Sequence, residues 1–152
     1  MKRHLILIAL IAVAVTACKK DKFNAAEQAK TDEADIKYYI GINKIPAVKD
    51  DESPLYYQII NSGSDSHPTE TAKVTLAFEI SLLDGTQINK GTTSAQPLSG
   101  LIEGLRRGIP KIGAGGQIIL FIPSALAYGP QGYANIPPNK VLIYKLNLVS
   151  FN

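Results

Sequence analysis

The sequence predicts an α+β fold, in which a curved antiparallel β-sheet, or half-barrel, wraps around one short α-helix, with an additional helix near the N-terminus. Three observations predict it. Apolar and polar residues alternate over residues 74–81 and again over 141–151, which is typical of strands with one buried face. The dipeptide Asp84-Gly85 is typical of a hairpin turn, because glycine accepts a positive φ. Apolar residues at i, i+4 and i+8 over 101–109 indicate the short helix.

The remaining strands are bounded by turn residues. Residues 55–60 form an apolar and aromatic run that predicts a strand, and the turn formers of 61–68 end it. Residues 117–122 predict another strand, which Pro123 ends. The final strand places alternate apolar side chains on one face, namely Leu142, Tyr144, Leu146 and Leu148.

The first residues predict a targeting segment that is not part of the fold. A positive stretch at 1–4 precedes an uninterrupted apolar stretch at 5–15, which is too short to span a bilayer stably and has the flanks of a signal peptide. Val15-Thr16-Ala17-Cys18 resembles a lipobox, so we expect residues 1–17 to be a lipoprotein signal peptide and a lipidated Cys18 to be the first mature residue. An ordinary secretory signal with an incidental cysteine is the alternative.

Lipidation also explains why a cysteine is present. Cys18 is the only cysteine of the chain, so it cannot form an internal disulfide. Acyl chains on Cys18 would anchor the protein to a membrane of the bacterial cell envelope. We expect the outer membrane in preference to the inner one, with the domain in the periplasm or at the surface.

Composition argues against a nucleic-acid partner. Loss of Lys2 and Arg3 with the signal lowers the formal charge from +3 to +1, and no cluster of Lys and Arg with interleaved aromatic residues remains.

Removing 17 of the 152 residues leaves 135, which suit a single domain with an extension. We expect a tether and an N-terminal helix over 18–50, and the domain itself over 51–152.

A helix is predicted over residues 31–44, after a polar tether at 19–30 that becomes helical towards its end. Three apolar residues share one face, namely Ile36, Tyr39 and Ile40. Acidic residues fall in the expected first turn, where the helix dipole favours them: Asp32, Glu33 and Asp35. Pro46 prevents continuation of the helix. Because so short a helix gains most of its stability from burial, we expect it to pack on the domain or on a second copy in a homodimer.

Glycine, proline and aromatic residues in the last third of the chain follow the order and near spacing of a known family. They are Gly104, Gly108, Gly113, Gly116, Phe121-Ile122-Pro123, Ala127-Tyr128-Gly129, Gly132 and Ile136-Pro137-Pro138. The pattern resembles the C-terminal signature of the FKBP-type peptidyl-prolyl cis-trans isomerases, over roughly residues 71–151. The resemblance implies the α+β half-barrel, an FKBP-like domain over 51–152, and acceleration of Xaa-Pro rotation in proline-containing envelope or secreted polypeptides.

Such an activity needs neither a nucleophile nor a metal. Rotation about a peptide bond meets a barrier of about 18–20 kcal/mol, which arises from the partial double-bond character of C–N. A site lowers this barrier by preferring the twisted amide, whose carbonyl is less polar. The sequence contains no Ser/His/Asp set, metal cluster or phosphate loop, and His67 is alone in a turn, so we expect no metal and no cofactor.

The resemblance implies roles for nine residues. Tyr128 matches the tyrosine whose hydroxyl donates a hydrogen bond to the substrate carbonyl. The matching substrate-binding positions are Phe78, Ile88, Asn89, Leu101, Ile102, Leu105, Ile136 and Tyr144. Four of them depart from the family's pattern, since Phe78 replaces a tyrosine, Ile88 a phenylalanine, Asn89 an aspartate and Leu105 a frequent tryptophan. The departures keep the pocket apolar but remove a hydroxyl, a charge and aromatic surface.

Several of these residues also have a structural interpretation. Leu101, Ile102 and Leu105 would be apolar in any helix packed on a sheet, and so would Phe78. Tyr128 follows a turn and precedes a Gly-rich loop, where core packing explains an aromatic residue poorly. Two functions therefore stay open: a lipid-anchored isomerase, and a catalytically weak FKBP-like binding or chaperone module in a membrane-associated assembly.

Overall fold

The structure, a computed structural model, describes residues 23–152, and the predicted signal peptide and Cys18 lie outside them. Within the described residues the α-helices and strands are α1 (Ala25–Ile42), β1 (Val48–Lys49), β2 (Tyr56–Asn61), β3 (Lys73–Leu82), β4 (Gln87–Thr92), β5 (Gln96–Pro97), α2 (Glu103–Gly108), β6 (Gln117–Ile122) and β7 (Leu142–Phe151). Short 3₁₀ helices connect them: η1 (Leu98–Gly100), η2 (Ile109–Lys111), η3 (Ser124–Leu126) and η4 (Gly129–Gln131).

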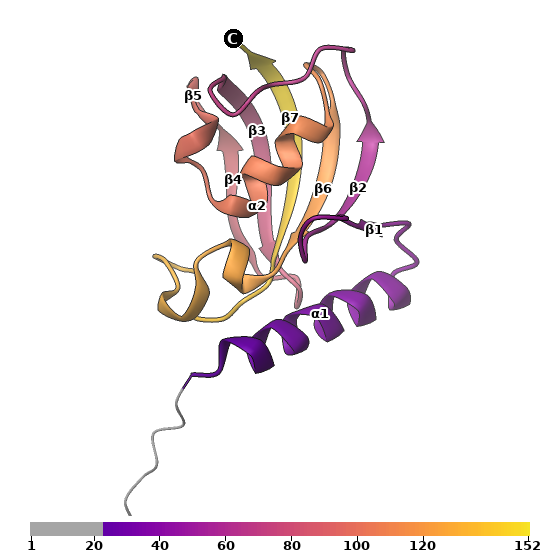
Figure 1. Cartoon of the computed structure of the whole chain (residues 1–152), viewed down its shortest axis with the longest axis vertical. Coiled ribbons are helices and arrows are strands. Elements are labelled where there is room, and N and C mark those ends of the chain that lie inside the picture. Colours follow the sequence, from indigo (N-terminus) through magenta and orange to yellow (C-terminus); the bar gives the residue numbers. More distant parts are fainter. Residues whose placement is uncertain (1–22) are drawn as a thin grey trace, which may run out of the picture.

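The strands form one antiparallel sheet in the order β1-β2-β6-β7-β3-β4, with β5 paired to β3. Its two long strands, β3 and β7, pair along their whole length, from Val74 opposite Phe151 to Leu82 opposite Leu142. Figure 1 shows the curved sheet with α2 lying across its inner face and α1 running beneath its lower end. This arrangement confirms the predicted fold class.

The main core lies between α2 and the inner face of the sheet. The alternate residues of β7 that were predicted to share a buried face are all buried there, together with Ile118, Leu120 and Ile122 of β6. Two glycines allow α2 to approach β6 closely. A Cβ atom on Gly104 would lie 2.4 Å from Ile122 Cγ2, and one on Gly108 would lie 2.4 Å from Leu120 Cδ1. A larger residue at either position would therefore force the buried Ile122 or Leu120 side chain, or the helix itself, to shift.

The short helix is shorter than the predicted range of residues 101–109. α2 covers only Glu103–Gly108, and the chain continues into η2, which begins at Ile109 and contains Pro110 in its first turn. Leu101 precedes the helix in extended backbone, with φ −86° and ψ 164°. Its apolar character therefore reflects its place beside the inner face of the sheet and not a position on a helical stripe.

The predicted hairpin at Asp84-Gly85 joins β3 to β4. The Leu82 N–H donates to the Thr86 carbonyl at 2.9 Å, and Gly85 has a φ of +87°. Beyond the turn the register shifts between Ile80 and Ser81, so that Ile88 is the extra residue of a β-bulge.

The N-terminal helix begins earlier than predicted. α1 starts at Ala25, and the side chain of Asn24 caps it by accepting from the backbone N–H groups of Ala26 and Glu27. The first-turn placement of the acidic residues is therefore wrong. Asp32 lies in the middle of the helix and is buried.

The apolar face of α1 packs on the domain, which is the first of the two predicted alternatives. Ile36 and Ile40 contact the outer side of the sheet and form a second core with Tyr56, Phe121, Val141 and Ile143. The Tyr39 and Phe121 rings lie 6.0 Å apart between centroids. Dimerisation through the N-terminal helix stays a prediction. None of the helices within residues 23–152 is both long and apolar enough to cross a membrane.

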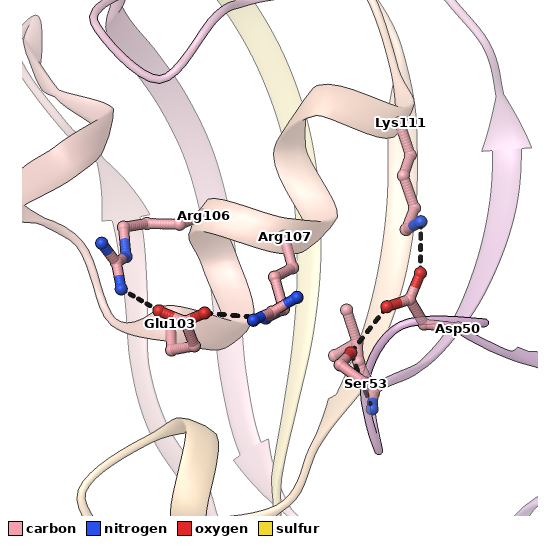
Figure 2. Close-up of polar contacts among 7 residues, drawn as sticks. Asp50, Ser53, Glu103, Arg106, Arg107 and Lys111 are labelled. Carbon is pink, nitrogen blue, oxygen red and sulfur yellow. Dashed lines mark hydrogen bonds and ion pairs between the residues drawn. The ribbon is translucent and has the colours of Figure 1, made fainter.

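Polar contacts fix η2, which directly follows α2, to the segment after β1 (Figure 2). The Lys111 ammonium lies 2.6 Å from Asp50 Oδ1 and 4.6 Å from the centroid of the Tyr57 ring, while the Ser53 hydroxyl donates to Asp50 Oδ2. Burial acts to raise the pKa of Asp50, but the hydrogen bonds from Lys111 and Ser53 outweigh it and lower that pKa below its ordinary value. On α2 itself, Glu103 pairs with Arg106 and Arg107.

Candidate active site

A cavity of about 440 Å³ opens between β3, β7, the start of α2 and the loop that follows β6. Its wall is mostly apolar and includes Leu76, Phe78, Ile80, Leu101, Ile102, Leu105 and Leu146. Three tyrosines border it, namely Tyr128, Tyr133 and Tyr144, and the other polar side chains are those of Asn89, Thr93 and Gln96.

Seven of the nine predicted site residues line this cavity. They are Phe78, Asn89, Leu101, Ile102, Leu105, Tyr128 and Tyr144. Ile88 and Ile136 are not in its wall. Ile88, the bulge residue, is partly buried and packs against the inner core, whereas Ile136 is buried and its backbone bridges to Tyr133 within the loop. A direct role in binding substrate stays a prediction for all nine.

The loop that carries Tyr128 is shaped by glycine. Gly129 and Gly132 have φ angles of +54° and +65°, which L residues with side chains rarely adopt. A Cβ atom on Gly132 would lie 2.5 Å from the Ile136 carbonyl oxygen. The Asn139 N–H donates to the Gly129 carbonyl at 2.8 Å, so the segment before β7 holds the loop in place.

Tyr133 was not predicted as a site residue. Its ring stacks on that of Tyr128, with centroids 5.0 Å apart and planes inclined by 12°, and 64% of its surface is exposed. The pair forms an aromatic edge to the cavity. The only sequence signal was an aromatic residue within a Gly-rich loop, where core packing does not explain it.

The Tyr144 hydroxyl lies in an environment that favours its neutral form. Burial raises the pKa of its hydroxyl well above the ordinary value, and the nearby Tyr128 hydroxyl raises it further. Among residues 23–152, none of those lining the cavity is Asp, Glu, His, Cys, Lys or Arg. The cavity can therefore enclose an apolar group and offer tyrosine hydroxyls to a carbonyl, but its wall supplies no ordinary general acid or base.

Phe78 and Asn89 do not form a hydrogen-bonded pair at the cavity edge. Phe78 has no polar atom in its side chain, and Asn89 Oδ1 accepts instead from the Lys90 backbone N–H at 2.8 Å.

A larger groove of about 610 Å³ lies on the outer face of the sheet. Glu79 is one of its lining residues and pairs with Lys90 at 3.2 Å and with Lys145 at 3.3 Å. Its charges already have partners, and it lacks the tyrosine cluster of the smaller cavity. Within residues 23–152, no group of three or more His, Cys, Asp and Glu side chains is arranged to hold a metal ion.

Comparison with known proteins points to one family. Residues 64–149 match the family model described as FKBP-type peptidyl-prolyl cis-trans isomerase. The chain is 33% identical over 135 residues to the FKBP-type peptidyl-prolyl cis-trans isomerase FkpA of Escherichia coli, which covers 86% of this chain and 48% of that protein. It is 30% identical over 140 residues to the outer membrane protein MIP of Legionella longbeachae, covering 88% of this chain and 59% of that one. The chain thus spans about half the length of the curated relatives it matches.

Solved structures agree with the fold. The crystal structure of FkpA from Escherichia coli superposes with a TM-score of 0.72 at 29% identity, over 84% of this chain and 62% of that one. A peptidyl-prolyl cis-trans isomerase from Pseudomonas syringae gives a TM-score of 0.68 over 86% of this chain and 98% of that chain. Its identity of 22% bears on the fold alone.

Proposed function

We propose that this chain, which belongs to the FKBP-type peptidyl-prolyl cis-trans isomerase family, accelerates cis-trans rotation of Xaa-Pro bonds in polypeptides. The observation that carries the proposal is the apolar cavity bordered by Tyr128 and Tyr144, in a chain of that family. The uncatalysed step lasts tens of seconds or more, and both isomers are populated because the cis form costs only about 0.5–1 kcal/mol.

The cavity supports a mechanism that uses neither covalent chemistry nor a metal. A proline ring would fit against Leu101, Ile102 and Leu105. The carbonyl group of the Xaa-Pro bond would then be shielded from water. Water stabilises the planar amide, whose carbonyl is strongly polar, more than the twisted one, so exclusion of water favours the twisted amide. The Tyr128 hydroxyl would donate to a substrate carbonyl and orient the peptide. Exclusion of water therefore favours the twisted amide over the planar one, which is the requirement for catalysis, whereas the hydroxyl serves to orient the peptide.

Tyr128→Phe tests the hydroxyl. We expect kcat/KM to fall by about two- to tenfold, the equivalent of about 0.5–1.5 kcal/mol for one net hydrogen bond, with the fold unchanged. Tyr38→Phe is the matched control, because Tyr38 is a tyrosine on α1 that is 71% exposed and does not line the cavity. If Tyr128→Phe had the same kcat/KM as the control, the proposed role of the Tyr128 hydroxyl would be contradicted.

The second candidate function is a non-catalytic binding or chaperone module. The observation that favours it is the altered edge of the cavity, where Phe78 and Asn89 make no mutual hydrogen bond. Such a module would keep the apolar cavity and bind clients without accelerating rotation.

Phe78→Tyr combined with Asn89→Asp separates the two candidates. If the dry apolar cavity supplies most of the catalysis, the wild type is active and the double variant gains no more than about tenfold in kcat/KM, or about 1.4 kcal/mol. A wild type at the uncatalysed rate that still protects an unfolding client from aggregation would favour the binding module. Circular dichroism of both proteins checks that the fold is equal.

We also propose that the protein is a lipoprotein of the bacterial cell envelope. The signal-like residues 1–17 and the lipobox-like tripeptide before Cys18 support this, and one relative is itself called an outer membrane protein. Lipid at Cys18 would leave only a few residues between the membrane and the start of α1.

Cys18→Ser in the full chain tests the anchor. We expect the protein to leave the membrane fraction and to accumulate in a soluble or unprocessed pool, because stable anchoring needs acyl chains that serine does not receive. Fractionation with an antibody measures the change, and mass spectrometry of the wild type checks the lipid. Wild-type protein without lipid would contradict the proposal.

A further inference from the structure

Asp32 is a buried carboxylate that joins the N-terminal helix to the loop before Tyr128. Its side chain is in the middle of α1, and only 1% of the residue is exposed. Oδ2 accepts from the Ser124 backbone N–H at 2.8 Å and from the Ser124 hydroxyl at 2.6 Å. Oδ1 accepts from the Gln28 amide at 2.7 Å. A buried carboxylate that accepts three hydrogen bonds is well stabilised. Removal of the carboxylate would leave each of the three donors without its partner.

The contact replaces a cap that the local sequence lacks. Ser124 is the first residue of η3, and the residue before it is Pro123, which gives no side-chain cap. Helix starts leave backbone N–H groups without partners, and a carboxylate is well suited to accept from them. Asp32 therefore caps η3 from an element 92 residues away in sequence.

The capped turn leads directly to Tyr128. The Ser124 carbonyl accepts from the Ala127 N–H at 3.0 Å, which closes the turn and sets the backbone from which Tyr128 projects. On the other side, the Asn139 N–H holds the Gly129 carbonyl. Tyr128 thus lies between two anchors, one from α1 and one from the segment before β7.

We propose that Asp32 is a positioning residue of the candidate active site, which acts through Ser124 to hold the Tyr128 hydroxyl at the cavity. The inference rests on the proposed isomerase function. It makes α1 a part of the site, although no residue of that helix lines the cavity. Asp32 makes no contact with substrate in this scheme.

A double-mutant cycle between Asp32 and Tyr128 tests the proposal. Asp32→Ala is expected to lower kcat/KM by about two- to tenfold, because the loss cannot exceed the worth of the hydroxyl that Asp32 positions. The same change in the Tyr128→Phe background is expected to have almost no effect, since there is no hydroxyl left to position. A general loosening of the protein would lower kcat/KM equally in both backgrounds, and that result would overturn the proposal.

Further variants show that the hydrogen bonds are responsible. Asp32→Asn keeps an oxygen for Ser124, and the Gln28 amide can turn to accept from the new NH₂ group, so this variant should retain wild-type kcat/KM within about twofold. Ser124→Ala removes one of the two bonds and should give an intermediate loss. It replaces Asp32→Ala in the cycle if that variant does not fold. Asp35→Asn, an exposed position on the same helix, is the control for charge.

A measurement without substrate separates this inference from the proposed function. In the NMR spectrum of protein with isotope-labelled tyrosine, the ring signals of Tyr128 are identified as those that are absent from the spectrum of Tyr128→Phe. They should shift in Asp32→Ala and Ser124→Ala but not in Asp35→Asn. Unshifted signals would overturn the positioning role whatever the activity. A wild-type rate equal to the uncatalysed one would instead refute the proposed function, and the ring signals would still decide whether Asp32 positions Tyr128.

Discussion

Leu101→Asp is expected to lower kcat/KM by about 100-fold while the protein stays folded. Leu101 lines the cavity and is only partly buried against the core, and it lies in extended backbone just before α2, outside any helix or strand. An ionised carboxylate there would keep water in the cavity and oppose the apolar environment that favours the twisted amide. Exposing a polar group to such an environment costs about 1–3 kcal/mol in proteins, and about 2.7 kcal/mol corresponds to 100-fold.

Two controls isolate the effect of charge in the cavity. Leu101→Ala removes the same apolar atoms without adding charge and should cost far less activity. Val149→Asp introduces the same carboxylate on the outer side of β7, where 47% of the residue is exposed, and should leave kcat/KM unchanged. Leu101→Asp activity within about threefold of the wild type, with a normal thermal melt, would contradict the role assigned to the dry cavity.

Ile36→Asp is expected to lower the free energy of unfolding by about 3–5 kcal/mol, the usual cost of an uncompensated charge in a core. The Ile36 side chain is fully buried between α1 and the outer side of the sheet, together with Tyr56, Phe121 and Ile143. The same change should also release the Asp32 contact with Ser124, because both residues lie on the buried face of α1.

Urea denaturation of a protein that comprises residues 23–152 measures the loss in the free energy of unfolding. Tyr38→Asp, on the exposed face of the same helix, should change the free energy of unfolding by less than about 0.5 kcal/mol. A loss below about 1 kcal/mol for Ile36→Asp would mean that α1 does not belong to the folded domain.

Local patterns predicted the longer strands of the sheet but not the two-residue strands β1 and β5. The strand at 117–122 coincides with β6, and the hairpin at Asp84-Gly85 lies where its turn residues placed it. Both signals depend on neighbours in sequence, which is why they can be read from one chain. The start of α1 was missed because residues 25–30 are polar and Ala-rich. Composition does not distinguish such a tether from a helix capped by Asn24.

The candidate site depended on the resemblance, since periodicity alone cannot separate a cavity wall from a core. Leu101, Ile102 and Leu105 look like core residues until the cavity beside them is known. Asp32 could not be recognised, because its partner Ser124 is 92 residues distant and an acidic residue in a polar helix is normally exposed. Tyr133 was missed because its stacking on Tyr128 depends on the path of the loop.

The most direct test of the proposed function is the rate of cis-trans exchange in several Xaa-Pro peptides. This rate is measured in the presence and absence of the signal-free protein. We expect wild-type protein to accelerate exchange above the uncatalysed rate, which corresponds to tens of seconds or more at 25 °C. We expect Leu101→Asp to remove most of that acceleration. A wild-type rate equal to the uncatalysed rate on every peptide, with the fold verified by circular dichroism, would contradict the isomerase function and leave the binding module.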